Sequence, residues 1–239
     1  EKSQYFDIAE KYNVKVVFRP FIKIEPVEAK EFRSQKINIL DFSAVILTSK
    51  TAVDHYFRLS QEMRLQIPET MKYFCISEAV AVYLQKYIIF RKRKIFFPVS
   101  GKMEDLVVIV SKHNKETYLV PVTDVHKEDL TKPLDDKKIR YTKAVMYRTV
   151  SNDFAADEPF DYDILLFFSP SGIASLMKNF PNFEQKDTVF GTFGPATAKA
   201  VKDAGFKLDI EAPNPAATSM TAALDQYLKT VIKPAVKKK

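Results

Sequence analysis

The chain has 239 residues, 46% of them hydrophobic and 28% charged, with a formal net charge of +7 at pH 7. This composition is typical of a globular protein with one large or two ordinary domains, and charges interrupt each apolar run before it reaches the roughly 18 residues of a membrane span. The single cysteine, Cys75, excludes an intrachain disulfide and a cysteine metal site, and it favours a reducing, cytoplasmic setting. The positive charge favours an acidic partner, although the basic run 91–94 and the "KPAVKKK" tail supply part of it as solvated surface.

Runs rich in β-branched and aromatic residues predict strands along the whole chain, and most are continuously apolar, as in parallel strands buried on both faces. In chain order these runs are 14–20, 44–49, 73–77, 94–97, 118–122, 141–150, 163–169, 188–193 and 206–212. Helical patterns such as "KTAVDHYFRL" and "SMTAALDQYL" lie between them. The alternation of strand and helix predicts an α/β protein.

The two halves of the chain resemble each other in three successive blocks, which are 42–57 with 162–177, 72–84 with 188–201, and 93–110 with 206–228. The first pair is related by a shift of 120 residues, from 42 to 162, and the second aligns Ser77 with Gly194. Repetition in the same order indicates a duplicated unit. The sequence therefore predicts two similar parallel-sheet α/β lobes.

The remaining segments predict how the two lobes are connected. Residues 1–22 and 150–239 are expected to form one discontinuous lobe, and 28–145 an inserted lobe. Strands near 22–28 and 145–150 then cross between the lobes side by side as a two-stranded hinge. The first 26 residues resemble the strand–helix–strand unit of 116–150 without its first strand, so the native start of the protein is expected to precede Glu1.

Ligands of parallel α/β sheets bind beyond the carboxyl ends of the strands, where loops lead into helices. Capping residues mark four such junctions, at Ser49, Ser77, Ser169 and Gly194. In Ser169-Pro170 and Gly194-Pro195, an N-cap is followed by proline at the first helical position. Helix N-termini bind phosphates and carboxylates, so two facing lobes would offer several anion sites to one strongly anionic ligand. Capped helices also occur in α/β folds of every function, and Glu78, which would repel an anion, makes the Ser77 turn the weakest of the four.

Other chemistries find less support. The run "SPSG" resembles a nucleophile elbow, but its glycine pattern is incomplete and no histidine has a recognisable place in a triad. The spacing of His55, His113 and His126 indicates no metal site, and the chain has neither a P-loop lysine nor a GxGxxG motif for a nucleotide cofactor. In "MYRTV", strand alternation places Tyr147 and Thr149 on one face and Arg148 on the other. At a lobe junction, Tyr147 either faces the ligand or packs structurally at the hinge.

The turns together resemble the uroporphyrinogen-III synthase family over nearly the whole chain. The resemblance lies in "ILTSKTAV", "YRT", "FFSPSGI" and, most specifically, "FGPATAKAVKDAGFKLDIEAPNPAATSMTAAL". It implies a two-lobed, hinged fold and a cyclising lyase of heme biosynthesis that closes linear hydroxymethylbilane, with inversion of ring D, to uroporphyrinogen III. It also implies an anionic linear tetrapyrrole with eight carboxylates as substrate, with no cofactor and no metal.

The resemblance also implies roles for individual residues. Tyr147 matches the family tyrosine proposed to assist departure of the substrate hydroxyl. The substrate-binding turns match Thr48, Ser49, Lys50, Ser77, Ser169, Pro170, Ser171, Gly172, Gly194, Pro195, Ala196 and Thr197. Two positions depart from the family pattern, since Ala196 and Val80 stand where threonines are usual. These departures favour recognition through main-chain N–H groups.

Two other functions stay open at this point. A non-catalytic tetrapyrrole-binding or sensor protein would keep the fold and lose turnover, for which Ala196 and Val80 are the motivating departures. Nucleic-acid binding through "RKRK" and the lysine tail lacks interleaved aromatic residues and a known motif. We expect a cytoplasmic monomer that binds neither nucleic acid nor membrane.

Overall fold

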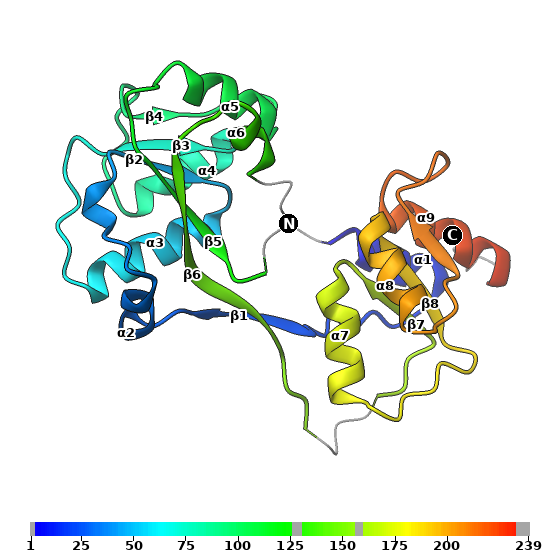
Figure 1. Ribbon diagram of the computed structural model, residues 1–239. Helices are drawn as coiled ribbons and strands as arrows, with labels where there is room; N and C mark the ends of the chain where they lie inside the picture. Colours follow the sequence, from blue (N-terminus) through cyan, green and yellow to red (C-terminus); the bar gives the residue numbers. More distant parts are fainter. Residues whose placement is uncertain (1–2, 126–130, 156–159, 233–239) are drawn as a thin grey trace. The chain divides into compact units, whose positions relative to one another are not determined.

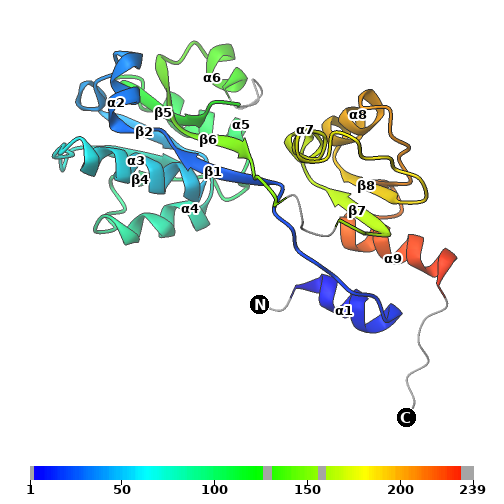
Figure 2. The same ribbon diagram turned by 90° about the horizontal axis from the view of Figure 1, so that it is seen from below.

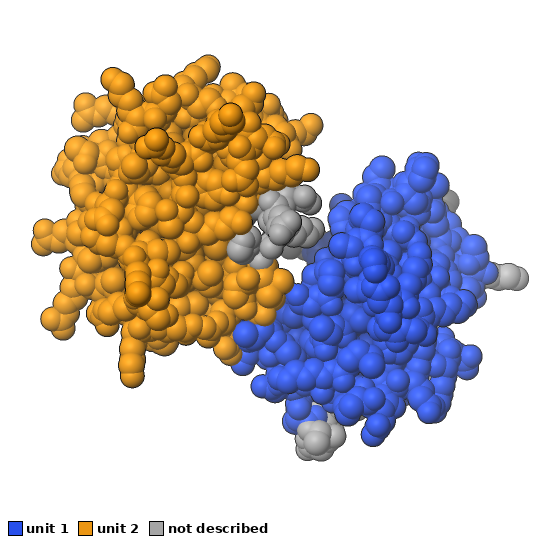
Figure 3. Space-filling model, in the orientation of Figure 1, with its two compact units in different colours: residues 1–23, 150–239 blue, residues 24–149 orange. Residues whose placement is uncertain are grey.

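The computed structural model (Figures 1 and 2) describes residues 3–125, 131–155 and 160–232. The chain divides into two compact units (Figure 3), which we call unit 1, residues Glu1–Lys23 with Val150–Lys239, and unit 2, residues Ile24–Thr149. Within the described parts, no helix combines the length and the apolar character that crossing a bilayer requires.

Unit 2 is built on a sheet of strand order β1-β6-β5-β2-β3-β4. These strands are β1 (Ile22–Pro26), β2 (Ala44–Leu47), β3 (Lys72–Cys75), β4 (Ile95–Phe96), β5 (Tyr118–Thr123) and β6 (Tyr141–Ser151). Neighbours from β6 to β4 pair in parallel. Strand β1 runs antiparallel to β6, because Val27 N donates to Met146 O whereas the earlier Phe21 O accepts from the later Asn152 N.

Helices cover both faces of this sheet (Figure 2). They are α2 (Ala29–Phe32), α3 (Lys50–Glu62), α4 (Glu78–Tyr83), α5 (Met103–Ser111) and α6 (Lys132–Asp136), with short 3-10 turns at Arg33–Gln35, Ile39–Asp41 and Leu84–Lys86. Helices α3 and α4 share one core cluster with Val45 and Leu47, whereas α5 shares the other with Ala44 and Ile46. All four residues of β2 are fully buried, as the continuous apolar run predicts.

Cys75 is the last residue of β3 and is fully buried in the core beside α3 and α4. Burial raises the pKa of its thiol to about 12, because the charged thiolate loses its hydration there. The side chain therefore behaves as a small apolar group.

Unit 1 contains a sheet of three parallel strands, β7 (Ile164–Phe167), β8 (Val189–Phe193) and β9 (Ile210–Ala212), in that order. Its helices are α1 (Gln4–Tyr12), α7 (Pro170–Asn179), α8 (Pro195–Asp203) and α9 (Met220–Val231). Helices α7 and α8 cover one face, and α1 and α9 the other (Figure 2).

The order β2-α3-β3-α4-β4-α5 of unit 2 recurs in unit 1 as β7-α7-β8-α8-β9-α9, with the strands in the same spatial order. Ala44–Leu47 of β2 and Ile164–Phe167 of β7 are 120 residues apart, as the sequence repeat predicts (164 minus 44). The predicted α/β class with two similar parallel-sheet lobes is confirmed.

The strand predicted at residues 14–20 is wrong, because this segment pairs with none of the described strands. In unit 2, β6 joins the sheet through β5, which lies between β6 and β2. No described strand of unit 1 takes the equivalent place beside β7, so the segment forms no ladder there; at its two ends, Val14 N donates to Ala9 O and Pro20 O accepts from the Asn152 side chain. It is held by side chains instead, since the guanidinium of Arg19 lies 4.3 Å from the ring centroid of Phe154 and Nη1 donates to the Tyr162 hydroxyl at 3.1 Å.

Gly191 in the middle of β8 gives a test of the unit 1 core. A Cβ atom at this position would lie 2.5 Å from Leu166 Cδ2 and 3.3 Å from Ile210 Cβ. We expect Gly191→Ala to lower the free energy of unfolding by about 1–3 kcal/mol, because overpacking forces neighbours to shift. Urea denaturation followed by circular dichroism measures the change. The double variant with Leu166→Ala should lose less stability than the two single changes together, and simple additivity would contradict the steric account.

Candidate functional site

The residues that sequence motifs single out lie in two groups, one at the carboxyl edge of the sheet in each unit. In unit 2 this group consists of Thr48, Ser49 and Lys50 after β2, Ser77 after β3, and Tyr147 on β6. Because β2 and β3 are parallel neighbours, α3 and α4 begin side by side at that edge. In unit 1 the group consists of Ser169, Pro170, Ser171 and Gly172 after β7, and Gly194, Pro195, Ala196 and Thr197 after β8.

Ser49 caps its own helix. Its hydroxyl accepts a hydrogen bond from Ala52 N at 3.0 Å, so one of the free N–H groups of α3 is already satisfied by protein. Thr48 is half-buried at the end of β2, whereas Lys50 is exposed with its ammonium 5.3 Å from the centroid of the Tyr83 ring. Of this turn, the Lys50 charge is therefore better exposed to an anion than the Ser49 hydroxyl.

The Ser77 turn starts the short helix α4, and its hydroxyl makes no capping hydrogen bond. Glu78 lies in the first turn and is exposed, where its charge opposes an anionic ligand. Val80, where the resemblance implies a threonine, is 6% exposed and packs in the core with α3. In this chain the position therefore contributes to packing and not to a polar surface.

Tyr147 lies at an irregularity of β6 that the sequence analysis missed. Val122 of β5 is opposite Val145, but Thr123 is opposite Tyr147, so Met146 is an extra residue on β6. Such a bulge breaks the strict alternation of side chains, and both Met146 and Tyr147 pack in the core cluster that contains α3. The bulge thereby brings the Tyr147 ring to the first turns of α3.

Burial and two contacts define the environment of Tyr147. The side chain is 8% exposed and its ring stacks on His55 of α3, with centroids 5.0 Å apart and planes inclined by 19°. Its hydroxyl hydrogen-bonds with Ser49. Burial raises the pKa of Tyr147, and the Ser49 hydrogen bond offsets part of this rise. The phenol therefore stays protonated at neutral pH.

Arg58 of α3 holds this region together. Its Nη2 atom donates to Val27 O at 2.8 Å and to Met146 O at 3.2 Å, which ties the bulge of β6 to the end of β1. Its Nε atom donates to His55 Nδ1 at 3.3 Å. Because Nδ1 accepts this bond, the imidazole that stacks on Tyr147 is neutral in this geometry.

In unit 1, the helix starts at Ser169 and Gly194 leave their first N–H groups without a side-chain cap. Neither α7 nor α8 carries an acidic residue in its first turn. The partial positive charge at both helix ends is therefore neutralised neither by an acidic side chain of the first turn nor by a side-chain cap. This makes them better anion sites than the turns of unit 2.

The backbone conformation of Gly194 explains why a glycine precedes Pro195 at the start of α8. Its φ of 89° is a left-handed conformation that disfavours other residues, and its N–H donates to Ala212 O at 2.6 Å. A Cβ atom at this position would have no atom within 4 Å, so the space above the backbone is open. A ligand can therefore approach this main chain closely.

The side chains of these unit 1 turns differ in their access to solvent. Ala196, where the resemblance implies a threonine, is exposed, so its methyl group lies on the surface. Thr197 is 2% exposed, so its hydroxyl is not accessible to a ligand, and Gly172, which has no side chain, is buried. Ser169 and Ser171 are half-buried. The turns consequently offer mainly backbone N–H groups.

Sequence reasoning missed a third helix start at this edge. Ser219 begins α9 after β9, and its hydroxyl accepts from Ala222 N at 3.1 Å. The third repeated block contained the signal, because it aligns β9 and α9 with β4 and α5. Since Ser219 caps its own helix, α7 and α8 remain the uncapped starts at this edge of unit 1.

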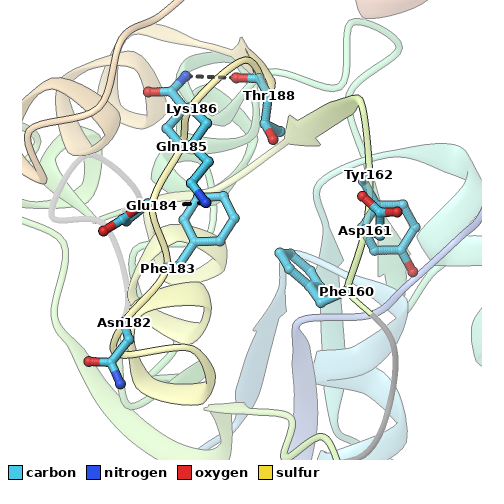
Figure 4. Close-up of a pocket in the computed structure, with 9 residues that line it drawn as sticks. All are labelled: Phe160, Asp161, Tyr162, Asn182, Phe183, Glu184, Gln185, Lys186 and Thr188. Atoms are coloured by element: carbon cyan, nitrogen blue, oxygen red, sulfur yellow. Dashed lines mark hydrogen bonds and ion pairs between the residues drawn. The ribbon is translucent and has the colours of Figure 1, made fainter.

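A surface pocket of unit 1 lies away from these turns (Figure 4). Its volume is about 340 Å³, and its lining residues are Phe160, Asp161, Tyr162, Asn182, Phe183, Glu184, Gln185, Lys186 and Thr188. These segments precede β7 and β8, so the pocket lies at the amino edge of the sheet. The basic run 91–94 likewise precedes β4 in unit 2, whereas the lysine tail lies outside the described residues. Neither feature extends the candidate site.

The two described histidines, His55 and His113, lie where packing explains them. His113 approaches Ile109 O with Nδ1 at 3.1 Å and contacts the Phe74 ring, whereas His126 lies outside the described residues. Across 3–125, 131–155 and 160–232, no group of three His, Cys, Asp or Glu side chains is placed to hold a metal ion.

The stacked histidine predicts how stability depends on pH. Burial and the charge of Arg58 lower the pKa of His55 below its ordinary 6.5, against smaller opposing effects of Asp54 and Glu62. The unfolded chain therefore binds more protons than the folded one just below pH 6.5, and stability is lost as the pH falls through the folded pKa. Urea titrations from about pH 8 to about pH 5 should show a smaller decline for His55→Phe and His55→Gln than for wild type. An unchanged decline in both variants would contradict this assignment.

Of the similar solved structures, the first reported below supports the fold. A uroporphyrinogen-III synthetase from Helicobacter pylori 26695 superimposes with a TM-score of 0.60 at 19% identity, covering 88% of this chain and 91% of that one. A mutant uroporphyrinogen III synthase from the extremely thermophilic bacterium Thermus thermophilus gives a TM-score of 0.49 at 13% identity, covering 89% and 87%. Comparison with curated proteins gave no significant match. The family model described as "Uroporphyrinogen-III synthase HemD" matches residues 3–222, which span both units, and the chain belongs to the uroporphyrinogen-III synthase family.

Proposed function

We propose that this protein is a uroporphyrinogen-III synthase, a cyclising lyase that converts hydroxymethylbilane to uroporphyrinogen III with inversion of ring D. The family match across residues 3–222 carries this proposal. The enzymes of this family act in heme biosynthesis. The motif-bearing turns at the carboxyl edges of both sheets support the same function.

The uncapped ends of α7 and α8 fit a substrate that carries eight carboxylates. Main-chain N–H groups at a helix N-terminus bind carboxylates through hydrogen bonds and the helix dipole. The absence of acidic residues from both first turns and the net charge of +7 favour such a ligand. Recognition through main-chain groups is insensitive to the loss of a hydroxyl at Ala196.

The reaction asks little of catalytic side chains. The pyrrole nitrogen of the substrate pushes electrons toward the hydroxymethyl carbon, the C–O bond breaks, and water leaves with a proton from the nitrogen, giving an azafulvene. The substituted carbon of ring D then attacks through a spiro intermediate, and that ring inverts. Holding one folded conformation suppresses the unrearranged product, and such orientation is worth roughly 7 to 11 kcal/mol in favourable cases.

In this mechanism Tyr147 donates a hydrogen bond to the departing hydroxyl. Its raised pKa keeps the phenol protonated, and the His55 stack with the Arg58 hydrogen bonds fixes the ring. A hydroxyl that leaves as water needs a proton or a hydrogen bond, which a positioned phenol supplies. The Tyr147 side chain is only 8% exposed, which fits a group that contacts the substrate through its hydroxyl alone.

The remaining expectations accompany this proposal. The reaction as written consumes no cofactor and needs no metal, and the anionic linear tetrapyrrole is the partner that the charge pattern favours. A monomeric state and a cytoplasmic location stay predictions; the buried thiol of Cys75 fits a reducing compartment.

The direct test supplies hydroxymethylbilane to the purified protein, oxidises the products and separates the porphyrin isomers. A synthase yields predominantly the type III isomer, because the enzyme outpaces spontaneous closure to type I. Formation of type I alone would refute the proposal. Tight binding of the substrate without type III product would instead identify a non-catalytic tetrapyrrole-binding protein.

The Tyr147→Phe variant removes the hydroxyl and keeps the aromatic ring, so it measures what the hydroxyl alone contributes to turnover. We expect turnover to fall by roughly 10²-fold, while the product remains type III, because ring D is oriented by binding. Tyr141→Phe on the same strand is the matched control, since it removes a hydroxyl that donates to Asp135 at 2.8 Å. Steady-state kinetics and circular dichroism of both variants measure the effect. Full activity of the folded Tyr147 variant would remove Tyr147 from the mechanism.

A further inference from the structure

Two phenylalanine side chains are exposed to solvent at the carboxyl edge of the sheet in unit 1. Phe168 directly follows β7 and is 57% exposed, and Phe193 ends β8 and is 38% exposed. Their ring centroids are 6.5 Å apart and their planes are inclined by 31°. We call Phe168 and Phe193 the aromatic pair.

The sheet register explains why the two rings lie together. Phe167 is the Cα partner of Thr192, so Phe168 and Phe193 occupy the next position of the parallel pair. Leu166, two residues before Phe168, packs with α9, as does Val189 near the start of β8. The aromatic pair lies on the same face of the sheet as Leu166 and Val189, but beyond the part of that face that α9 covers. Packing within unit 1 therefore does not account for its large apolar surface.

The neighbouring main chain has the opposite character. Ser169 starts α7 immediately after Phe168, and Gly194 starts α8 immediately after Phe193; both helices lack a side-chain cap and an acid in the first turn. The space above Gly194 is open. An aromatic surface is thus joined to two positively polarised helix ends.

We propose that the aromatic pair binds a pyrrole ring of the substrate while the carboxylates of that ring reach the N-termini of α7 and α8. This inference rests on the proposed function and deepens it. A pyrrole is a flat, electron-rich ring, and such rings pair with phenyl groups in offset-stacked or edge-to-face geometry at centroid distances of about 4.5–7 Å. Each ring of the substrate bears carboxylate side chains, so one ring satisfies both kinds of surface.

The repeat makes this feature specific to unit 1. The residues at the equivalent positions of unit 2 are Thr48, 120 residues before Phe168, and Ile76, 117 residues before Phe193. Both are half-buried. An exposed aromatic pair is therefore not a general property of this turn, and unit 2 offers a hydroxyl where unit 1 offers a ring.

The test replaces the rings while keeping apolar side chains, in Phe168→Leu, Phe193→Leu and the double variant. The first probe is uroporphyrin III, whose fluorescence reports binding of a ring system with eight carboxylates. The second is butanetetracarboxylate, a polycarboxylate without a ring, used as a competitor. Phe18→Leu is the matched control, because Phe18 is a 60% exposed phenylalanine of the same unit that contacts Tyr5 and Phe6.

We expect the double variant to bind uroporphyrin III about tenfold more weakly, as the loss of two aromatic contacts implies, with competition by butanetetracarboxylate unchanged. With hydroxymethylbilane, KM should rise and the fraction of type III product should fall. Phe18→Leu should match wild type in each measurement. These results together support the aromatic pair as a ring-binding surface.

Wild-type affinity of the double variant for uroporphyrin III overturns the inference. An equal loss of affinity for uroporphyrin III and for butanetetracarboxylate also overturns the inference. That result indicates disturbed helix ends and not a lost ring contact. A change in sedimentation of the free protein with unaltered porphyrin binding overturns it in favour of a contact between protein chains. If wild type makes no type III product and yet loses uroporphyrin affinity on Phe→Leu replacement, the synthase proposal fails while the ring-binding surface is supported.

Discussion

The extra residue in β6 at Met146 is the constraint on which the geometry around Tyr147 depends. Without it, alternation would send Met146 and Tyr147 to opposite faces of the sheet; with it, both pack against the side that carries α3. Arg58 gives the Met146 carbonyl a second donor beside Val27 N, and Arg58 also fixes His55 against the Tyr147 ring. The bulge at Met146, a local break in the hydrogen bonding of the sheet, thus orients the Tyr147 hydroxyl.

Duplication supplied the same framework twice, and the two copies differ in how their helix starts are satisfied. Ser49 and Ser169 occupy equivalent positions, yet Ser49 caps α3 with its own hydroxyl whereas Ser169 leaves α7 uncapped. Unit 2 has a phenol beside a capped helix, and unit 1 has open amide groups beside exposed rings. The two copies therefore present different chemistry at equivalent helix starts.

Much of the fold was predictable because buried parallel strands are continuously apolar and because proline and serine mark helix starts. The helix start at Gly194 followed from its glycine and proline. The failures have physical causes. Residues 14–20 have strand propensity, but no strand among the described residues pairs with them, and pairing is a tertiary property. The bulge at Met146 has no glycine or proline to announce it, and the burial of Thr197 depends on how α8 packs, which a motif at the helix start does not specify. The exposure of Phe168 could not be predicted from the sequence either, because an apolar run does not show where the helix that covers it ends.

The position of Cys75 has a practical consequence. The chain has one thiol, fully enclosed in β3 of unit 2, and its high pKa leaves almost none of it as the reactive thiolate at neutral pH. Alkylating reagents therefore reach it only when the strands and helices around it separate. The rate at which the native protein is labelled consequently reports the opening of unit 2 alone, and the unmodified chain carries its own probe for telling the unfolding of one unit from that of the other.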